Sequence, residues 1–573
     1  MSRIISPHRG TEVMAKKRHN FSSKRLEFGS RKNKLGDMTT WRGESSVKGS
    51  SESMRMALLT FSLVGIQFTW GIEMTYCTPY LLALGLTKTG TSLVWIAGPI
   101  SGLIMQPIVG IISDRSKSRF GRRRPFMVVG SLVVALSLLS LGWAKDIASL
   151  FVEELEPRKS VTIGIAILAI YAVDFAINGV QACCRALIVD TLPVSKQQLG
   201  NAWGSRMISG GHLIGYAIGT LDLVKILGPT IGDNQFKQLT VISALALLFT
   251  TCVTSWAVTE RILETDKEDD NSISFMRIIE KVYTTAKDLP PRIQAICNIQ
   301  LWSWIGWFPF HFYGTTYVGE IYYRYEVPEN TKLSPDALGD IGRIGSLALV
   351  LFSSVHLAGA LILPQFIKTP EEEKFTHRPP DFIAGLVEKI DKYKPDLLSA
   401  WIYGQILFSC TMIFTPYARS FQFAAFLVAL CGLPWLLSIW APVTFMGIEV
   451  NRISSKSSSI PLSSKLESGE IHSFYADKDY GEIKDSQRGD SGLYFGIFNI
   501  YTTIPQFIGT FISMIVFAVL EPGKSPELAQ DSPASEHQKI EGPNAISVCL
   551  VIGAGSMVGA MFATRKLKKL YDM

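Results

Sequence analysis

One otherwise apolar segment carries four polar side chains at helical spacing, and these are the residues best suited to chemistry. They are Asp174, Asn178, Gln181 and Arg185, spaced i, i+4, i+7 and i+11. An α-helix turns by about 100° and rises by about 1.5 Å per residue, so the four side chains share one face over about 16 Å. Polar groups are costly inside hydrocarbon, so this face should look into a helix bundle or a watery cavity.

A carboxylate and a guanidinium on one helical face, with amides between them, can exchange a proton and hold a polar solute. We therefore predict Asp174 as a proton-coupling group, and Asn178, Gln181 and Arg185 as substrate-binding residues. The alternative is a structural polar seam that only joins this helix to its neighbours.

A second polar set lies in the first apolar segment, at Gln67, Trp70 and Glu73. Trp70 and Glu73 are an i, i+3 pair and can share a surface. Aromatic faces pack against C–H groups of a ligand, while amides and carboxylates hydrogen-bond to its polar groups. We predict Gln67 and Trp70 as substrate ligands. Glu73 is either a second proton-coupling site or a structural hydrogen-bonding residue.

The second half of the chain offers fewer candidates. Asn499 and Gln506 stand seven residues apart on one helical face and are predicted substrate ligands. His311 lies in a Trp-rich segment, where a lone histidine is more often a hydrogen-bonded core residue than a proton relay. His212 and Asp222 are further polar intrusions to which the sequence gives no role.

A dense basic loop, Gly110–Pro125, separates two apolar segments. So many cations are costly to translocate, which places this loop in the cytoplasm. Carboxylate–guanidinium pairs across the helix ends can also hold one conformation of a moving bundle, and the alternative is a purely topological charge run. The predicted gate residues in the loop are Asp114, Arg115, Arg122, Arg123 and Arg124.

Two residues of the second half join the predicted gate. Glu320 is either a gate residue or simply exposed at a helix end, and exposure is slightly favoured. Arg343 is either a gate residue or an anchor that extends its charge to the membrane interface.

The elements that must position these residues are membrane-spanning helices. The 573-residue chain is 47% hydrophobic and only 18% charged, which is typical of a polytopic membrane protein. Runs of about twenty apolar residues are each long enough to cross a ~30 Å hydrocarbon core. Twelve spans are predicted, near 57–81, 91–112, 126–144, 161–182, 204–226, 239–258, 297–317, 344–366, 398–416, 420–440, 492–520 and 545–563. The fold class is therefore an all-α integral membrane protein.

The polar segments divide the chain into two six-helix halves. The predicted parts are a disordered basic arm at 1–55, halves at 56–258 and 297–563, a linker at 259–296, a flexible loop at 441–491 and a tail at 564–573. Lys/Arg clusters occupy alternate connections, which places both termini in the cytoplasm. The membrane is predicted to be the plasma membrane, with a vacuolar or other endomembrane open. Two parallel halves place a substrate site between them near the bilayer midplane.

The sequence argues against catalysis. It has no Walker-type phosphate loop, no His/Cys metal spacing and no nucleophile elbow. The eight cysteines all fall in or beside apolar runs and are interpreted as small core residues. The net charge of +7 reflects membrane topology rather than a nucleic-acid surface. No enzyme activity, metal, cofactor or obligate protein partner is predicted.

Several motifs resemble one family. G-x-x-x-D-R followed by G-R-R-R resembles the loop between helices two and three of major facilitator transporters. The longer S-D-R-S-K-S-R-F-G-R-R-R-P-F resembles the form found in sucrose–proton symporters. The carboxylate and arginine eleven residues apart, Asp174 and Arg185, match the fourth helix of that family one for one. Gln67, Trp70 and Pro79 also match its pattern.

The departures from the plant pattern are informative. Glu73 stands where plant members usually have Gln. A Glu at this position resembles the animal and fungal branches of the family. Trp304, Trp307, Phe308 and Pro309 fit the W-x-x-W-F-P pattern, but two aspartates and an arginine that follow in plant members are missing. The resemblance therefore points to the glycoside-pentoside-hexuronide branch, and within it to the fungal general alpha-glucoside permeases.

The resemblance implies a function as well as a major facilitator fold. It implies a proton-coupled transporter that imports an alpha-glucoside, maltose or sucrose, by alternating access, with the proton as coupling ion. Two alternatives remain. An uncoupled facilitator would leave Asp174 with a hydrogen-bonding role only, and a sugar sensor would use loop 441–491 or the arm as its output.

Overall fold

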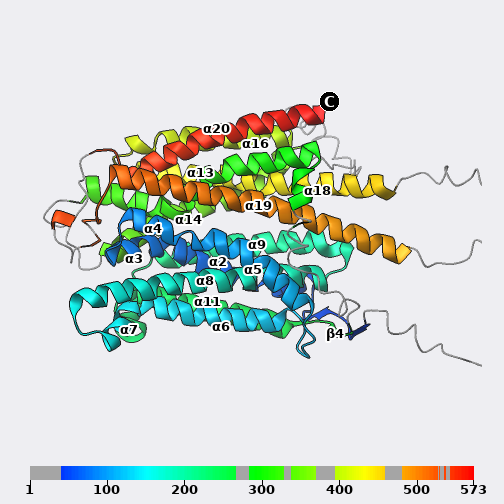
Figure 1. Cartoon of the computed structure of the whole chain (residues 1–573), viewed down its shortest axis with the longest axis horizontal. Coiled ribbons are helices and arrows are strands. Elements are labelled where there is room, and N and C mark those ends of the chain that lie inside the picture. Colours follow the sequence, from blue (N-terminus) through cyan, green and yellow to red (C-terminus); the bar gives the residue numbers. More distant parts are fainter. Residues whose placement is uncertain are drawn as a thin grey trace, which may run out of the picture.

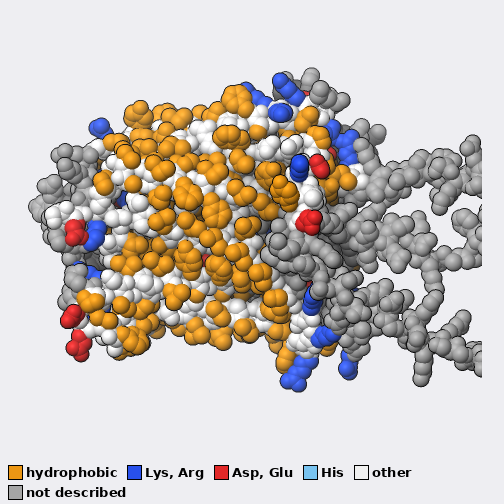
Figure 2. Space-filling view, viewed as in Figure 1, with side chains coloured by type: hydrophobic (Ala, Val, Ile, Leu, Met, Phe, Trp, Pro, Cys, Tyr) orange, Lys and Arg blue, Asp and Glu red, His pale blue; other side chains and the backbone are white. Residues whose placement is uncertain are grey.

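Long helices lying side by side along the long axis of the molecule make up nearly all of the structure (Figure 1). The structure, a computed structural model, describes residues 40–265, 280, 283–327, 337–368, 394–458, 480–526, 528–529, 534–536 and 542–572. Hydrophobic side chains cover the middle of the visible face, and charged side chains gather towards its two ends (Figure 2). That distribution suits a protein surrounded by lipid.

The first half consists of α-helices with short breaks. Its elements are α1 (Glu52–Thr60), α2 (Ser62–Ile72), the π-helix η1 (Glu73–Cys77), α3 (Thr78–Ala83), α4 (Lys88–Val94), α5 (Ala97–Asp114), α6 (Arg124–Gly142), α7 (Ala144–Phe151), α8 (Leu155–Thr191), α9 (Val194–Thr220), α10 (Leu223–Leu227), the 3₁₀-helix η2 (Gly228–Ile231) and α11 (Gln235–Ala257).

The second half is built in the same way. Its elements are α13 (Pro291–Tyr325), α14 (Ala337–Phe366), α16 (Leu397–Ile413), the 3₁₀-helix η5 (Thr415–Tyr417), α17 (Phe421–Leu430), α18 (Gly432–Ser458), α19 (Tyr480–Leu520), the 3₁₀-helix η7 (Ala534–Glu536) and α20 (Ala545–Asp572). Large buried side chains from both halves, such as Tyr76, Phe236, Tyr313 and Phe517, belong to one apolar core.

Each of the twelve predicted spans lies in helix. Among the described residues, nine helices are long and apolar enough to cross a membrane, and two bent pairs raise that number to eleven. The twelfth, α13, falls outside that set, although it is one of the longest helices and most of its side chains are buried. Because neighbouring helices surround α13, it can carry more polar and aromatic residues than a lipid-facing helix.

The first span is bent where its functional residues lie. Glu52–Thr60 and Ser62–Ala83 meet at 41°, and the π-helix η1 begins at Glu73. Pro79 has no N–H and so cannot donate to the carbonyl four residues earlier, which loosens the turn that precedes it. Such π-turns are frequent at functional sites. Here the turn places Glu73 in the interior.

The predicted disorder of arm 1–55 is wrong for its last part. β1 (Thr40–Arg42) pairs antiparallel with β4 (Ile262–Thr265), and β2 (Ser46–Val47) pairs with β3 (Val258–Thr259). Helix α1 then begins at Glu52. Strands so short form only because the partner segment is already held at the end of α11, which composition does not reveal. Residues 1–39 lie outside the described residues.

The predicted flexible loop 441–491 is too wide. Helix α18 continues to Ser458 and α19 begins at Tyr480, while residues 459–479 lie outside the described residues. The predicted tail 564–573 likewise continues α20 to Asp572. Hydropathy marks the edge of the membrane and does not show where a helix ends, and in α20 good helix formers such as Lys, Arg and Leu continue the helix beyond that edge.

Helices α13 and α20 approach each other most closely at two glycines. A Cβ on Gly306 would lie 2.7 Å from the carbonyl oxygen of Gly553, and a Cβ on Gly553 would lie 3.0 Å from that of Gly306. Small residues permit such backbone contact between membrane helices, where dispersion rather than the hydrophobic effect holds them together.

We therefore expect Gly306→Ala to destabilise the protein. Overpacking of a tight interface costs about 1–3 kcal/mol, so the midpoint of thermal unfolding in detergent should fall by a few degrees. Gly314→Ala on α13 and Gly555→Ala on α20 are matched controls, because an added Cβ at either position meets nothing within 4 Å. Equal midpoints for Gly306→Ala and these controls would contradict the close contact.

Candidate functional site

The polar face of α8 is buried in the bundle as its spacing predicts. Asp174, Asn178 and Gln181 are each no more than 5% exposed, whereas Arg185, nearer the end of the helix, is exposed. The Asn178 amide nitrogen donates to Ser101 Oγ at 2.9 Å and to the Asp174 carbonyl at 3.0 Å. Asn178 thus joins α8 to α5, and a substrate would have to share its hydrogen bonds.

Glu73 and Asp174 come together from different helices. Glu73 projects from η1 and Asp174 from α8, and the two carboxyl groups are close enough to interact electrostatically. In the described part of the chain, Glu73 Oε1 and Asp174 Oδ2 are buried without a hydrogen-bond partner. An uncompensated charge at this depth is costly, so the pair is suited to hold a proton or to accept hydrogen bonds from a ligand.

Trp70 extends the same region from α2. Its indole nitrogen is buried and has no hydrogen-bond partner among the described residues, and Gln67 on the same helix is 3% exposed. Buried polar atoms are nearly always paired with protein, water or ligand. Trp70, Glu73 and Asp174 therefore present one donor and two acceptors that a bound solute can satisfy. These three residues and Gln67 form what we call the central site.

The predicted ligands of the second half lie less clearly in this site. Gln506 donates its amide to the Thr502 carbonyl of its own helix at 3.0 Å, and both Gln506 and Asn499 are half-buried on α19. No hydrogen bond joins either side chain to Gln67, Glu73 or Asp174 among the described residues. Their role as ligands stays a prediction.

The arginine loop forms a compact network, which we call the basic-end cluster, at the end of the bundle that carries residues 115–124. Arg123 pairs with Asp114 and donates its Nε to Asp190 at 2.9 Å, while Arg122 pairs with Asp190 at 2.8 Å. Burial alone would lower the pKa of Arg123, but Asp190 and Asp114 outweigh it and hold that pKa above its ordinary value. Arg115 is exposed and makes no ion pair in the described part of the chain.

Glu260, between β3 and β4, is a member of this cluster that the sequence analysis missed. Its carboxylate accepts hydrogen bonds from the backbone N–H groups of Arg122 at 3.1 Å and of Arg123 and Arg124 at 2.8 Å. It therefore caps the amino end of α6, where unpaired N–H groups and the helix dipole favour an anion. Gly121, with φ +101°, allows Glu260 to approach the backbone, because a Cβ added at Gly121 would lie 2.6 Å from Glu260 Oε1.

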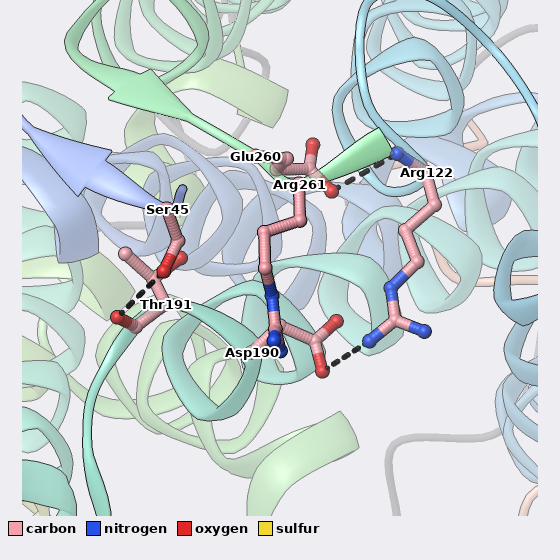
Figure 3. Close-up of a pocket in the computed structure, with 6 residues that line it drawn as sticks. All are labelled: Ser45, Arg122, Asp190, Thr191, Glu260 and Arg261. Carbon is pink, nitrogen blue, oxygen red and sulfur yellow. Dashed lines mark hydrogen bonds and ion pairs between the residues drawn. The ribbon is translucent and has the colours of Figure 1, made fainter. Parts of the chain in front are cut away.

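The strands formed by the arm hold Glu260 in place. Figure 3 shows Glu260 and Arg261 on one side of a small pocket, with Arg122, Asp190, Thr191 and Ser45 around it. Ser45, just before β2, donates to the Thr191 carbonyl at the end of α8. The arm, the end of α8 and the start of α6 are thus tied together within the first half.

A second network of charges is buried at the opposite end of the bundle, which we call the distal cluster. Lys88 at the start of α4 lies between two carboxylates of the second half, Glu320 at 2.6 Å and Glu521. Glu521 also pairs with Arg324 at 2.6 Å, and Asn544 donates to Glu320 at 2.6 Å. Lys88, Glu320 and Glu521 are each 3% exposed, so the favoured expectation that Glu320 is simply exposed is wrong.

Further polar contacts join the halves near this distal end. Arg343 pairs with its neighbour Asp340 and lies 3.8 Å from Asp222 of the first half. The Tyr313 hydroxyl bonds to Ser92 Oγ at 3.0 Å. By contrast, Arg122 and Arg123 of the basic-end cluster pair with Asp114 and Asp190 of their own half, and the Arg292–Glu449 pair at 3.2 Å lies within the second half. The conformation is therefore closed at the distal end.

A bundle of long apolar helices, two buried carboxyl groups inside it and a closed charge network at one end are the features of a secondary transporter of the major facilitator type. A family model described as MFS/sugar transport protein matches residues 60–295. The General alpha-glucoside permease of Schizosaccharomyces pombe is 31% identical over 540 residues, covering 85% of this chain and 90% of the relative. The chain belongs to the MFS/sugar transport protein family.

A second relative and a solved structure agree with this assignment. The Sucrose transport protein SUC4 of Arabidopsis thaliana is 27% identical over 427 residues, covering 70% of this chain and 79% of the relative. The crystal structure of the POT family transporter PepTSo has a TM-score of 0.52 at 11% identity, covering 90% of this chain and 98% of that one. Such a distant match supports the fold alone. The predicted family, fold class and non-enzymatic nature are confirmed.

Loss of the Lys88 charge should weaken closure at the distal end. Lys88 is the cation that joins Glu320 and Glu521 across the halves, and its loss weakens that junction although Glu521 retains Arg324 and Glu320 retains Asn544. In Lys88→Met we expect the buried Cys77, in η1, to react several-fold faster with a water-soluble maleimide. The labelling of a Cys77→Ala variant is subtracted, because it reports the other cysteines. Lys145→Met is the control, because Lys145 is exposed and makes no ion pair among the described residues. Unchanged Cys77 labelling would contradict the role of Lys88.

The same reporter tests how the distal cluster responds to acid. Burial would raise the pKa of Glu521, but the Lys88 and Arg324 charges outweigh it and hold that pKa below its ordinary value. Its stabilising contribution is therefore present above the ordinary carboxyl pKa and is lost only as pH falls through the lowered pKa. The rate of Cys77 labelling, divided at each pH by the rate for a free thiol because maleimide reacts with the thiolate, should be the same at about pH 7 and about pH 5. Faster labelling at the lower pH would contradict the lowered pKa.

Glu260 should matter through the helix that it caps. Loss of a helix-capping acceptor costs about 0.5–2 kcal/mol, and Glu260→Ala removes the acceptor for three N–H groups. We expect a fall of a few degrees in the midpoint of thermal unfolding. Glu154→Ala is the matched control, since Glu154 precedes α8 without a side-chain cap. Equal midpoints would show that water replaces the Glu260 carboxylate without loss.

Proposed function

We propose that this protein is a proton-coupled transporter that imports an alpha-glucoside, such as maltose or sucrose. The observation that carries the proposal is the buried Glu73–Asp174 pair, which has unpartnered oxygens and lies in a chain 31% identical to a General alpha-glucoside permease. Sugar hydroxyls can donate to both carboxyl groups, and the Trp70 indole can donate to a sugar oxygen. The proton serves as the coupling ion.

The orientation in the membrane follows from the basic loop. Residues 115–124 carry six cations and face the cytoplasm by the positive-inside rule, as do both termini. The distal end then faces the outside of the cell, and the conformation closed at that end is inward-facing. Import of a nutrient sugar places the protein in the plasma membrane. A vacuolar or other endomembrane with the same orientation is the alternative.

The distal cluster forms and separates during the proposed transport cycle. In the outward-facing form, Lys88 is separated from Glu320 and Glu521, and the sugar enters with Asp174 or Glu73 protonated. The halves then rock until Lys88 returns to the two carboxylates and closes the distal end. The higher cytoplasmic pH removes the proton. Each positive charge carried inward gains about 2.3 kcal/mol per 100 mV of membrane potential.

The basic-end cluster has a different part in this cycle. Arg122, Arg123 and Glu260 hold the ends of α5, α6 and α8 together, so the first half can move as one body. Arg343 and Asp222 meet across the halves and separate when the distal end opens. Arg185, exposed on α8, is suited to donate hydrogen bonds to the sugar.

Asp174→Asn tests the coupling directly. In cells without other sugar transporters, the wild type should accumulate labelled maltose or sucrose and alkalinise the medium, and a protonophore should abolish both effects. Asp174→Asn should lose uphill accumulation but retain exchange of sugar across the membrane, because an amide keeps the hydrogen bond and cannot release a proton. Asp233→Asn, an exposed carboxylate, is the control.

The other outcomes are equally decisive. Normal accumulation by Asp174→Asn would rule out this residue as the coupling group and leave Glu73. Wild-type uptake without alkalinisation would make the protein a facilitator. No uptake of either sugar would contradict the proposed substrate while leaving the family assignment intact.

A further inference from the structure

Four aromatic rings of the second half form a cup that the transport cycle above does not use. Trp304, Trp307 and His311 stand at i, i+3 and i+7 on α13, so they share one helical face. Trp435 of α18 completes the set, with its ring centroid 4.3 Å from that of His311, 4.9 Å from Trp307 and 5.8 Å from Trp304. We call these four residues the aromatic cup.

The cup combines rigid and accessible parts. Trp307 is fully buried, packs on Phe408 at 4.4 Å and donates its indole N–H to Ser438 Oγ at 3.2 Å. Trp304 and Trp435 remain half-buried, so part of each ring is not covered by protein. The packing of Trp307 thus fixes the base of the cup, and the other two indoles form its sides.

His311 carries the polar group of the cup. Its Nε2 is buried without a hydrogen-bond partner in the described part of the chain, although we interpreted this residue as a hydrogen-bonded core histidine. Among the described residues, none of the neighbouring rings donates a hydrogen bond to this nitrogen or accepts one from it. An imidazole nitrogen in that position is expected to bond to water or to a ligand hydroxyl.

The cup faces the first half rather than the lipid. Thr315, one turn after His311 on α13, donates its hydroxyl to the Met74 carbonyl of the first half at 3.2 Å, so this part of α13 lies against the first half. His212 of α9, also in the first half, lies within electrostatic range of His311. His212 Nε2 is likewise buried without a partner among the described residues. Trp302, on another face of α13, instead contacts Gly559 of α20 and is 46% exposed.

We propose that the aromatic cup binds the second sugar ring of a disaccharide, with the uncovered part of either the Trp304 or the Trp435 ring against its C–H face and His311 Nε2 bonded to one hydroxyl. This inference rests on the proposed function, and it assigns the two sugar rings to different halves of the protein. The central site offers carboxyl, amide and indole N–H groups to one ring, and the cup offers apolar faces and a single imidazole to the other. A glycoside with only one ring would not need the cup.

The experiment compares Michaelis constants for maltose, sucrose and methyl α-glucoside in His311→Phe, which keeps a ring but loses the hydrogen bond. We expect KM to rise about tenfold for both disaccharides and to stay unchanged for methyl α-glucoside. His311→Gln, which keeps a hydrogen-bonding group, should recover much of the loss. Trp304→Leu should act like His311→Phe, and Trp302→Phe is the matched control. Variant abundance at the cell surface normalises each rate.

The outcomes separate the cup from the proposed function. Equal KM values in His311→Phe and Trp302→Phe would overturn the cup, and so would an equal rise for all three sugars. If the wild type takes up none of them, the proposed function fails. The cup is then tested in the purified protein by maltose-dependent quenching of tryptophan fluorescence, which Trp304→Leu must reduce relative to Trp302→Phe. No difference between these two variants would overturn the cup independently.

Discussion

The cost of burying charge is the constraint on which the structure depends. Lys88, Glu320 and Glu521 lie almost wholly out of contact with solvent, and an isolated ion in such a place would be prohibitively costly. They are tolerable only because they face one another across the boundary between the halves. The distal end can therefore close in one arrangement, in which the cation of the first half sits between the anions of the second.

The same constraint explains why the central site is unusual. Glu73 and Asp174 are as deeply buried as the distal charges, yet each keeps an oxygen without a partner among the described residues. The bend and π-turn of the first span hold Glu73 there, and the long helix α8 holds Asp174. A protein pays for such unsatisfied groups only where a proton or a ligand completes them, so the carboxyl pair is best understood as a binding site.

Local signals in the sequence predicted the helices and one face of the site well. Twenty-residue apolar runs require helices in a bilayer, and the period of Asp174, Asn178 and Gln181 placed them together on the buried side of α8. Lys88 and Glu260 were missed because nothing near them in the chain indicates a partner. Lys88 pairs with residues of the other half, and Glu260 caps a helix that begins at Arg124. The strands of the arm also depend on a distant segment.

Opening of the distal end need not be costly, because each carboxylate keeps a second partner. When Lys88 withdraws, Glu521 retains Arg324 and the N–H of Ala545, and Glu320 retains Asn544. Lys88 itself gains water in place of the two carboxylates. A buried ion pair is worth little relative to its separated, hydrated ions, since desolvation offsets most of the attraction. In the proposed transport cycle the open and closed states can therefore be similar in free energy, so a proton or a sugar bound at the central site would bias the equilibrium between them.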